Sequence, residues 1–126
     1  MISQYIAVGL GGALGAITRI CLSKILPSMI AGVPFQLLII NILGCFIMGI
    51  LVQLTTSYWL ESESIKHFLM SGLLGEFTTF SGFTLDFGSL IEKDKYMSAT
   101  FYLMLSVWLS IACFFLGTKI TKVLTS

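Results

Sequence analysis

Four apolar stretches of membrane-spanning length occupy most of this chain and constrain its fold more than any other feature. A helix needs about 20 predominantly apolar residues to cross the hydrocarbon core of a bilayer. The stretches cover Tyr5–Leu26, Phe35–Leu54, Phe68–Ile91 and Met97–Leu116. Only 10% of the 126 residues are charged, whereas an average soluble domain carries about 25%. The sequence therefore predicts an all-α integral membrane protein, with residues 1–126 forming a single domain of four transmembrane helices.

Polar residues and glycines interrupt the third apolar stretch near its middle. The interrupting segment reads Gly75-Glu76-Phe77-Thr78-Thr79-Phe80-Ser81-Gly82-Phe83. Lipid offers no partner to a free backbone group, so non-helical backbone at this depth persists only where it is buried in protein or lines a polar path. We therefore expect the third helix to be broken here and the break to mark the functional site. The carbonyl groups freed around Gly75 and Thr78 are suitable ligands for a hard cation.

Several other polar residues lie within the apolar stretches, where each is a functional candidate because its burial in lipid is costly. The amide of Asn41 has two donor hydrogens, which helix self-bonding cannot satisfy, so it either joins two helices or serves a pathway. Phe80 and Phe83 are three residues apart and share one helical face. Such a pair is commonly core packing, but ring edges beside the break could also contact a small anion stripped of water. The other candidates are Arg19, Gln36, Glu76, Thr78, Thr79, Ser81, Thr84, Asp86, Tyr102, Ser106 and Ser110.

The sequence contains little that is typical of an enzyme. Cys21, Cys45 and Cys113 all lie within apolar stretches, at spacings that suit neither a disulfide framework nor a zinc site, so we interpret them as packing residues. His67 is the only histidine. Neither a phosphate-binding GxxxxGK[ST] motif nor a strand-linked GxGxxG motif is present. We expect no catalytic site, no ATP coupling and no nucleic-acid partner.

Basic residues near the ends of the apolar stretches set membrane orientation, because cytoplasmic loops carry an excess of lysine and arginine. The two sides are almost evenly matched, with Lys66, Lys119 and Lys122 on one and Lys24, Lys93, Lys95 and the more deeply placed Arg19 on the other. This balance predicts insertion in both orientations and an antiparallel dimer, although a small bias could still select one orientation. Four helices leave no room for an aqueous lumen, so a polar path would need a second copy to enclose it.

Three motifs resemble those of the Fluc fluoride channels, also called CrcB or camphor-resistance proteins. The segment Gly11–Ala16 with Arg19 is similar to the family's GGxxGAxxR, and Asn41–Gly49 is similar to its NxxGxFxxG. The segment Gly75–Phe83 resembles the third-span GGxTTFSTF, the most specific of the three. The resemblance covers essentially the whole chain. Gly11 and Gly15 also form a GxxxG pair suited to close helix approach, within one bundle or between copies.

The resemblance implies an antiparallel, dual-topology homodimer in the bacterial inner membrane, with two fluoride pores and a structural sodium ion at the two-fold axis. It assigns the carbonyl groups of Gly75 and Thr78 to the sodium ion. The other assignments are a hydrogen bond from Asn41 to fluoride, ring-edge contacts from Phe80 and Phe83, a polar track containing Ser81 and Tyr102, and Arg19 near an aqueous vestibule. The implied activity is passive export of cytoplasmic fluoride down its electrochemical gradient, which protects the cell against fluoride toxicity.

The chain departs from the family pattern at three places. Glu76 stands where a small residue is usual, Gly82 replaces a threonine, and Gln36-Leu37 stands where Gly-Thr is common. An ionised carboxylate at mid-span costs about 2.5–3.5 kcal/mol on insertion scales. Three arrangements of Glu76 would avoid this cost: protonation, exposure to a vestibule, or pairing with the sodium ion or Arg19.

The main alternative function is a proton-coupled antiporter of the small multidrug type, which also has four spans and forms antiparallel dimers. That mechanism uses an intramembrane carboxylate, and Glu76 is the candidate because embedded acids often mark proton relays. Such transporters carry the acid in the first span, which here contains Arg19 and no acid. A membrane scaffold would explain the glycine motifs but not the polar cluster of the third stretch.

Overall fold

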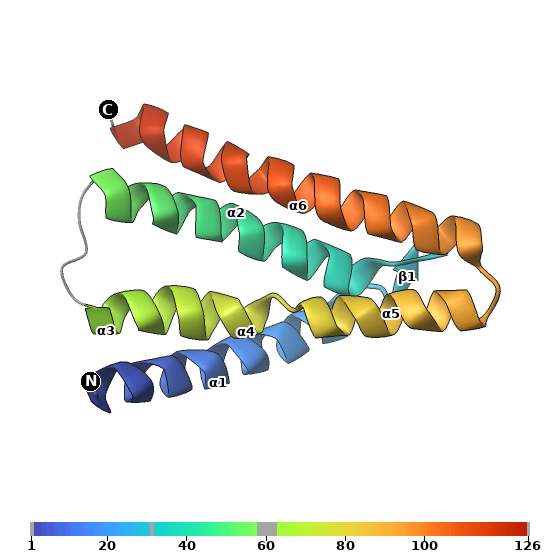
Figure 1. Ribbon diagram of the computed structural model, residues 1–126, viewed down its shortest axis with the longest axis horizontal. Coiled ribbons are helices and arrows are strands. Elements are labelled where there is room, and N and C mark those ends of the chain that lie inside the picture. Colours follow the sequence, from blue (N-terminus) through green and yellow to red (C-terminus); the bar gives the residue numbers. More distant parts are fainter. Residues whose placement is uncertain (1, 31, 58–62, 126) are drawn as a thin grey trace.

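The chain folds into long helices that lie alongside one another (Figure 1). The computed structural model describes residues 2–30, 32–57 and 63–125. Within these residues, three helices are long and apolar enough to cross a membrane: α1 (Ile2–Ile25), α2 (Phe35–Ser57) and α6 (Tyr96–Thr125). They correspond to the first, second and fourth predicted stretches, and α6 continues well past the predicted end at Leu116. The chain is therefore an all-α membrane protein, as its composition predicts.

The third apolar stretch forms a discontinuous segment instead of one helix. Its parts are α3 (Glu63–Lys66), the π-helix η1 (His67–Leu74), α4 (Gly75–Phe77) and α5 (Phe80–Glu92). The predicted break is present, because Thr78 and Thr79 separate α4 from α5. The length of the π-helical part was not predicted. Figure 1 shows that this segment runs in the same direction as α1, whereas α2 and α6 run in the opposite direction.

The connection between α1 and α2 contains a short strand pair that the sequence did not indicate. Strands β1 (Met29–Ile30) and β2 (Val33–Pro34) pair antiparallel, with Ile30 opposite Val33. The turn between them contains Gly32, whose φ of 81° is a conformation that favours glycine. The middle of the predicted second connection, residues 58–62, lies outside the described residues.

Glycines set the closest helix contacts in the chain. A Cβ atom on Gly11 or Gly15 would collide with the carbonyl oxygen of Phe68 or Leu73, respectively, and one on Gly72 would lie 2.7 Å from the Val8 carbonyl oxygen. Small residues allow helix backbones in membranes to approach in this way. The GxxxG pair in α1 therefore packs against η1 of the same chain, which answers a question that the sequence left open.

The buried apolar side chains form two clusters, one on each side of the break. The first contains Ile40, Leu74 and Phe77, and the second contains Leu38, Phe83, Leu90, Ala99 and Tyr102. Large apolar side chains such as Ile17 of α1 and Trp108 of α6 lie exposed on the exterior. Exposed apolar side chains of this kind suit a lipid or protein surrounding.

Candidate functional site

The break in the third segment is a short stretch of extended backbone. Thr78 has φ −90° and ψ 148°, and Thr79 has φ −150° and ψ 130°. The Thr79 side chain begins the next helix, because its Oγ1 accepts a hydrogen bond of 3.2 Å from the backbone N–H of Gly82. This is the ordinary N-capping role of threonine. Extended residues followed by a cap explain why the helix stops at Phe77 and begins again at Phe80.

Two residues of α2 hold the break in place. The Asn41 Nδ2 donates to the Thr79 carbonyl oxygen at 3.3 Å, and its Oδ1 accepts from the Thr79 N–H at 2.9 Å. One turn later, a Cβ atom on Gly44 would collide with the Thr78 side-chain methyl group. Asn41 therefore binds the backbone of Thr79, and Gly44, three residues later, leaves space for the side chain of Thr78. The second donor hydrogen of the Asn41 amide is left over from this pairing.

The break also leaves the Gly75 carbonyl group without its usual donors. In a regular helix this oxygen would accept from the N–H group four residues later, but that group, on Thr79, donates to Asn41. The Thr78 N–H donates to the Leu74 carbonyl oxygen at 3.0 Å. Backbone oxygens of this kind are appropriate ligands for a hard cation. The carbonyl group of Gly75, one of the two predicted ligands, is therefore chemically suited to a sodium ion.

Arg19 lies at the same break but does not pair with the Glu76 carboxylate. Its Nε donates to the backbone carbonyl oxygen of Glu76 at 3.1 Å. The Glu76 side chain is exposed and its Cγ would lie 3.3 Å from a Cβ atom placed on Gly12 of α1. Of the three arrangements considered for Glu76, pairing with Arg19 is therefore not the one seen here. Arg19 instead satisfies a backbone oxygen at the end of α4.

A cavity of about 480 Å³ lies beside the break. We call it the break cavity. It brings together three of the five predicted pore residues, because Asn41, Phe80 and Phe83 all line it. The rings of Phe80 and Phe83 have centroids 5.5 Å apart, but Phe80 is 77% exposed whereas Phe83 is only 7% exposed. The other lining residues are Cys45, Gly75, Thr78, Thr79, Ser106, Val107, Ser110 and Ile111.

The other two predicted pore residues, Ser81 and Tyr102, do not line this cavity. The hydroxyl groups of Ser81 and Thr79 share a hydrogen bond of 3.0 Å on the exposed side of the break. Tyr102 is fully buried behind Phe83, with ring centroids 4.9 Å apart, and its hydroxyl group donates to Asp86 Oδ2 at 3.2 Å. Tyr102 therefore supports the Phe83 ring from behind.

Two serines of α6 line the break cavity in their place. Ser106 is 8% exposed, and its Oγ is a buried side-chain oxygen without a hydrogen-bond partner in the described residues. Ser110 lies one turn further along α6. The sequence contained a signal for this arrangement, because Tyr102, Ser106 and Ser110 are spaced by four residues and share one helical face. The signal is weak, since serine in a helix commonly bonds its own backbone.

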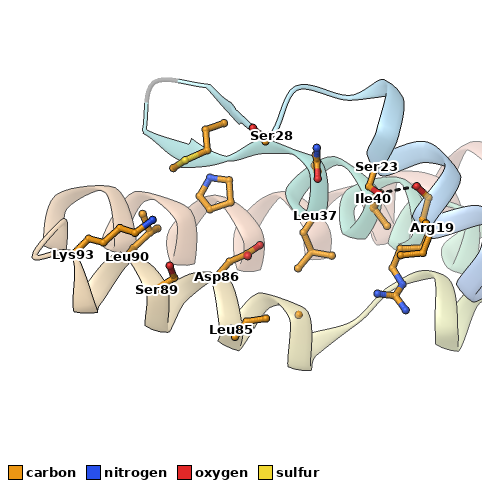
Figure 2. A pocket seen from close by; sticks show the side chains of 15 residues that line it. Arg19, Ser23, Ser28, Leu37, Ile40, Leu85, Asp86, Ser89, Leu90 and Lys93 are labelled. Atoms are coloured by element: carbon orange, nitrogen blue, oxygen red, sulfur yellow. Dashed lines mark hydrogen bonds between the residues drawn. The ribbon is translucent and has the colours of Figure 1, made fainter.

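A second cavity, of about 440 Å³, is lined by residues of α1, α2 and α5, among them Gly82 in the first turn of α5 (Figure 2). We call it the Arg19 cavity. Its charged lining residues are Arg19, Asp86 and Lys93. Arg19 therefore lies beside a cavity, and its place near an aqueous vestibule stays a prediction. In Figure 2 the Leu37 side chain extends from α2 toward α5, between the side chains of Asp86 and Arg19. The remaining lining residues are Ile20, Ser23, Ser28, Met29, Pro34, Gln36, Ile40, Gly82, Leu85, Ser89 and Leu90.

Comparison with known proteins gives a consistent result along nearly the whole chain. Residues 6–118 match the family described as CrcB-like protein, Camphor Resistance (CrcB). The chain is 35% identical over 120 residues to the fluoride-specific ion channel FluC of Chlorobium phaeobacteroides strain BS1, covering 95% of this chain and 94% of the relative. It is 36% identical over 122 residues to the protein of the same name from Rhizobium etli, covering 96% and 98%. A third protein of that name, from Ruminiclostridium cellulolyticum, is 36% identical over 124 residues, covering 98% and 95%.

Proposed function

This chain belongs to the CrcB-like family of multi-pass inner-membrane proteins, and on that basis we propose that it is a passive, fluoride-selective channel. The observation that carries the proposal is the convergence of Asn41, Phe80 and Phe83 on one cavity at a break in the third segment. Relatives that share about a third of its residues over 94–98% of their length are named fluoride-specific ion channels. A channel without energy coupling lets fluoride move only down its electrochemical gradient, so cytoplasmic fluoride would leave the cell by this route.

Selectivity for fluoride requires groups that replace the water around a small, strongly hydrated anion. The left-over N–H of Asn41 is one such donor, and the unpaired hydroxyl group of Ser106 is another. The ring edges of Phe80 and Phe83 carry partial positive charge. Each of these contacts is weak, which allows an ion to leave as readily as it enters.

We propose that the broken segment is the third of four crossings and that two copies pair as an antiparallel, dual-topology homodimer. Phe80 supports this proposal, because a large ring that lines the break cavity is also mostly exposed on one copy. A second copy would cover it and enclose the path. The even division of basic residues supports insertion in both orientations.

Orientation is tested by labelling a single cysteine in intact cells. Ser3→Cys, in a background where Cys21, Cys45 and Cys113 are replaced by alanine, places a thiol at an exposed end of α1. Dual insertion predicts labelling by a membrane-impermeant maleimide from both sides of the membrane. Labelling from one side only would contradict dual insertion, and a monomer in cross-linking experiments would contradict the dimer.

We also propose that the carbonyl groups of Gly75 and Thr78 hold a structural sodium ion where the two copies meet. The ion would satisfy oxygens that lipid cannot and would place positive charge near the anion path. Removing sodium, with N-methylglucamine as the replacement cation, should lower the melting temperature of the purified protein. An unchanged melting temperature would argue against the ion.

The channel function is tested with purified protein in liposomes loaded with either fluoride or chloride. We expect rapid fluoride efflux, without coupled proton movement, while chloride is retained. The antiporter alternative depends on the exposed carboxylate of Glu76 and predicts proton flux coupled to a hydrophobic cation. Glu76→Gln would abolish that flux but would leave fluoride efflux in place if the channel proposal is correct. Equal efflux of both halides would refute fluoride selectivity.

A further inference from the structure

Two departures from the family pattern, Leu37 and Gly82, meet in a single contact. A Cβ atom added to Gly82 would lie 3.0 Å from Leu37 Cδ2 and 3.6 Å from its Cδ1. The same Cβ atom would lie 3.0 Å from Thr79 Cγ2. Leu37 therefore occupies space that a side chain at position 82 would need. A larger residue on α2 is matched by the absence of a side chain on α5.

This contact lies at the boundary between the two cavities. Leu37 and Gly82 both line the Arg19 cavity. Asn41, one turn after Leu37 on α2, and Phe83, the residue after Gly82 on α5, line the break cavity. Leu37 also packs against the buried cluster that contains Phe83. A path from one cavity to the other along the contact between α2 and α5 would pass the Leu37 side chain.

The Leu37 side chain is apolar and lies among both charged and apolar side chains in the lining of the Arg19 cavity. Arg19, Asp86 and Lys93 line the same cavity, and Figure 2 shows Leu37 between the first two. Apolar constrictions in channels oppose the passage of hydrated ions, because water leaves a narrow apolar space. A strongly hydrated anion should be sensitive to such a barrier.

We propose that Leu37, seated on Gly82, is an apolar constriction that limits ion passage between the Arg19 cavity and the break cavity. The proposal rests on the channel function proposed above. The contact explains why Leu37 and Gly82 occur together. It predicts that the effects on efflux of changing side-chain volume at these two positions depend on each other.

The first test reduces the volume of Leu37. Leu37→Ala should raise the initial rate of fluoride efflux from liposomes about threefold, because the barrier becomes wider and wetter. Leu37→Met keeps a similar apolar volume and should leave the rate at the wild-type level. Leu43→Ala is the matched control, since Leu43 lies on the same helix, is exposed and lines neither cavity. A wild-type or lower rate in Leu37→Ala, from protein that elutes and melts normally, would overturn the proposal.

The second test adds volume at Gly82. Gly82→Ala should lower efflux about tenfold, because the new methyl group pushes Leu37 into the passage. Leu37→Ala in the same chain should restore the rate to within about twofold of wild type, a strongly non-additive result. The control is Gly88→Ala on α5, where a Cβ atom would meet nothing within 4 Å. Failure of Leu37→Ala to relieve the defect would overturn the coupling.

The outcomes also separate this proposal from the channel function itself. If the wild-type protein passes no fluoride, the proposed function fails. If the wild type passes fluoride but the Leu37 and Gly82 variants behave like their controls, only the constriction fails.

Discussion

The two halves of the broken third segment differ in how they are held. The first half, η1 and α4, packs backbone to backbone against α1, because Gly11, Gly15 and Gly72 carry no side chains at the contact. The second half, α5, has no such contact at its glycines. Gly82 faces only the tips of two side chains, and Gly88 faces nothing within 4 Å.

This difference indicates that the rigid part of the segment lies before the break and that the part beside the two cavities lies after it. Close backbone packing fixes the end of α4, so the carbonyl groups at the break are presented at a defined place. The start of α5 separates two cavities and presents Phe80 largely uncovered. Local stability is lower where few groups are packed. The first half therefore acts as an anchor, and the second half is the part that meets an ion.

The largest expected effect comes from breaking the anchor. Gly15→Ala should abolish recovery of folded protein, because the added methyl group would collide with the backbone of Leu73, which cannot rotate away as a side chain can. Overpacking usually costs about 1–3 kcal/mol and more where backbone must move. The measurement is the yield of monodisperse protein on size exclusion. Gly9→Ala is the control, since a Cβ atom there meets nothing within 4 Å. Equal yields from the two variants would remove the distinction between the halves.

A smaller effect, on both stability and flux, is expected at the junction of the halves. Asn41→Asp replaces the donor that faces the Thr79 carbonyl oxygen with a second acceptor. The loss of this bond at a half-buried site should cost about 1–3 kcal/mol of unfolding free energy and should cut fluoride efflux severely. Thermal melting and liposome efflux measure the two effects. Thr18→Val, which removes a hydroxyl group bonded only to its own helix, should change neither greatly. Normal efflux in Asn41→Asp would remove Asn41 from the site.

An effect on flux alone is expected in the second half. Phe80→Ile should reduce fluoride efflux about tenfold, because it removes a ring edge that carries partial positive charge from the path. The melting temperature should hardly change, since isoleucine keeps an apolar side chain at this position, which is mostly exposed on one copy. Phe101→Ile provides a control on an exposed phenylalanine of α6 that lines neither cavity. A stability loss without a flux loss would make Phe80 a packing residue.

The smallest effect is expected at Ser106. Its buried hydroxyl oxygen has no partner in the described residues, so Ser106→Ala should leave stability unchanged or slightly higher. Efflux should fall about twofold, because one weak donor leaves the path. Thr121→Val is the contrasting variant, since the buried Thr121 hydroxyl group donates to the Gly117 carbonyl oxygen at 2.8 Å. That variant should lose stability and keep its flux.

The sequence predicted the fold where hydropathy and lipid chemistry decide the outcome. The apolar stretches identified α1, α2 and α6, and the hydroxyl-rich segment identified the break at Thr78 and Thr79. The π-helical part and the strand pair were not predicted. Both depend on how the backbone adapts to neighbouring helices and turns, and a one-dimensional apolar pattern does not record this.

The site was predicted less completely, because its contacts join residues far apart in the chain. The motif positions of Asn41, Phe80 and Phe83 indicated residues that do share a cavity. The bond from Arg19 to a backbone oxygen of Glu76 joins residues 57 positions apart and involves no side chain of the second residue. The place of Ser81 on a polar track stays a prediction, and its hydroxyl group shares a local hydrogen bond with Thr79 of the kind that helix termini often offer.

The pairing of Asn41 with Thr79 has a consequence for how the protein is made. The ribosome delivers α2, which carries Asn41, before it delivers the third segment, because a chain is made from its N-terminus. When the break enters the bilayer, the Asn41 side chain that binds its backbone is already present there. A circularly permuted gene that placed residues 63–125 before α2 would reverse this order. The backbone N–H and carbonyl groups of Thr79 would then enter lipid before their hydrogen-bond partner Asn41 is made. Quality-control proteases should therefore degrade more of the product.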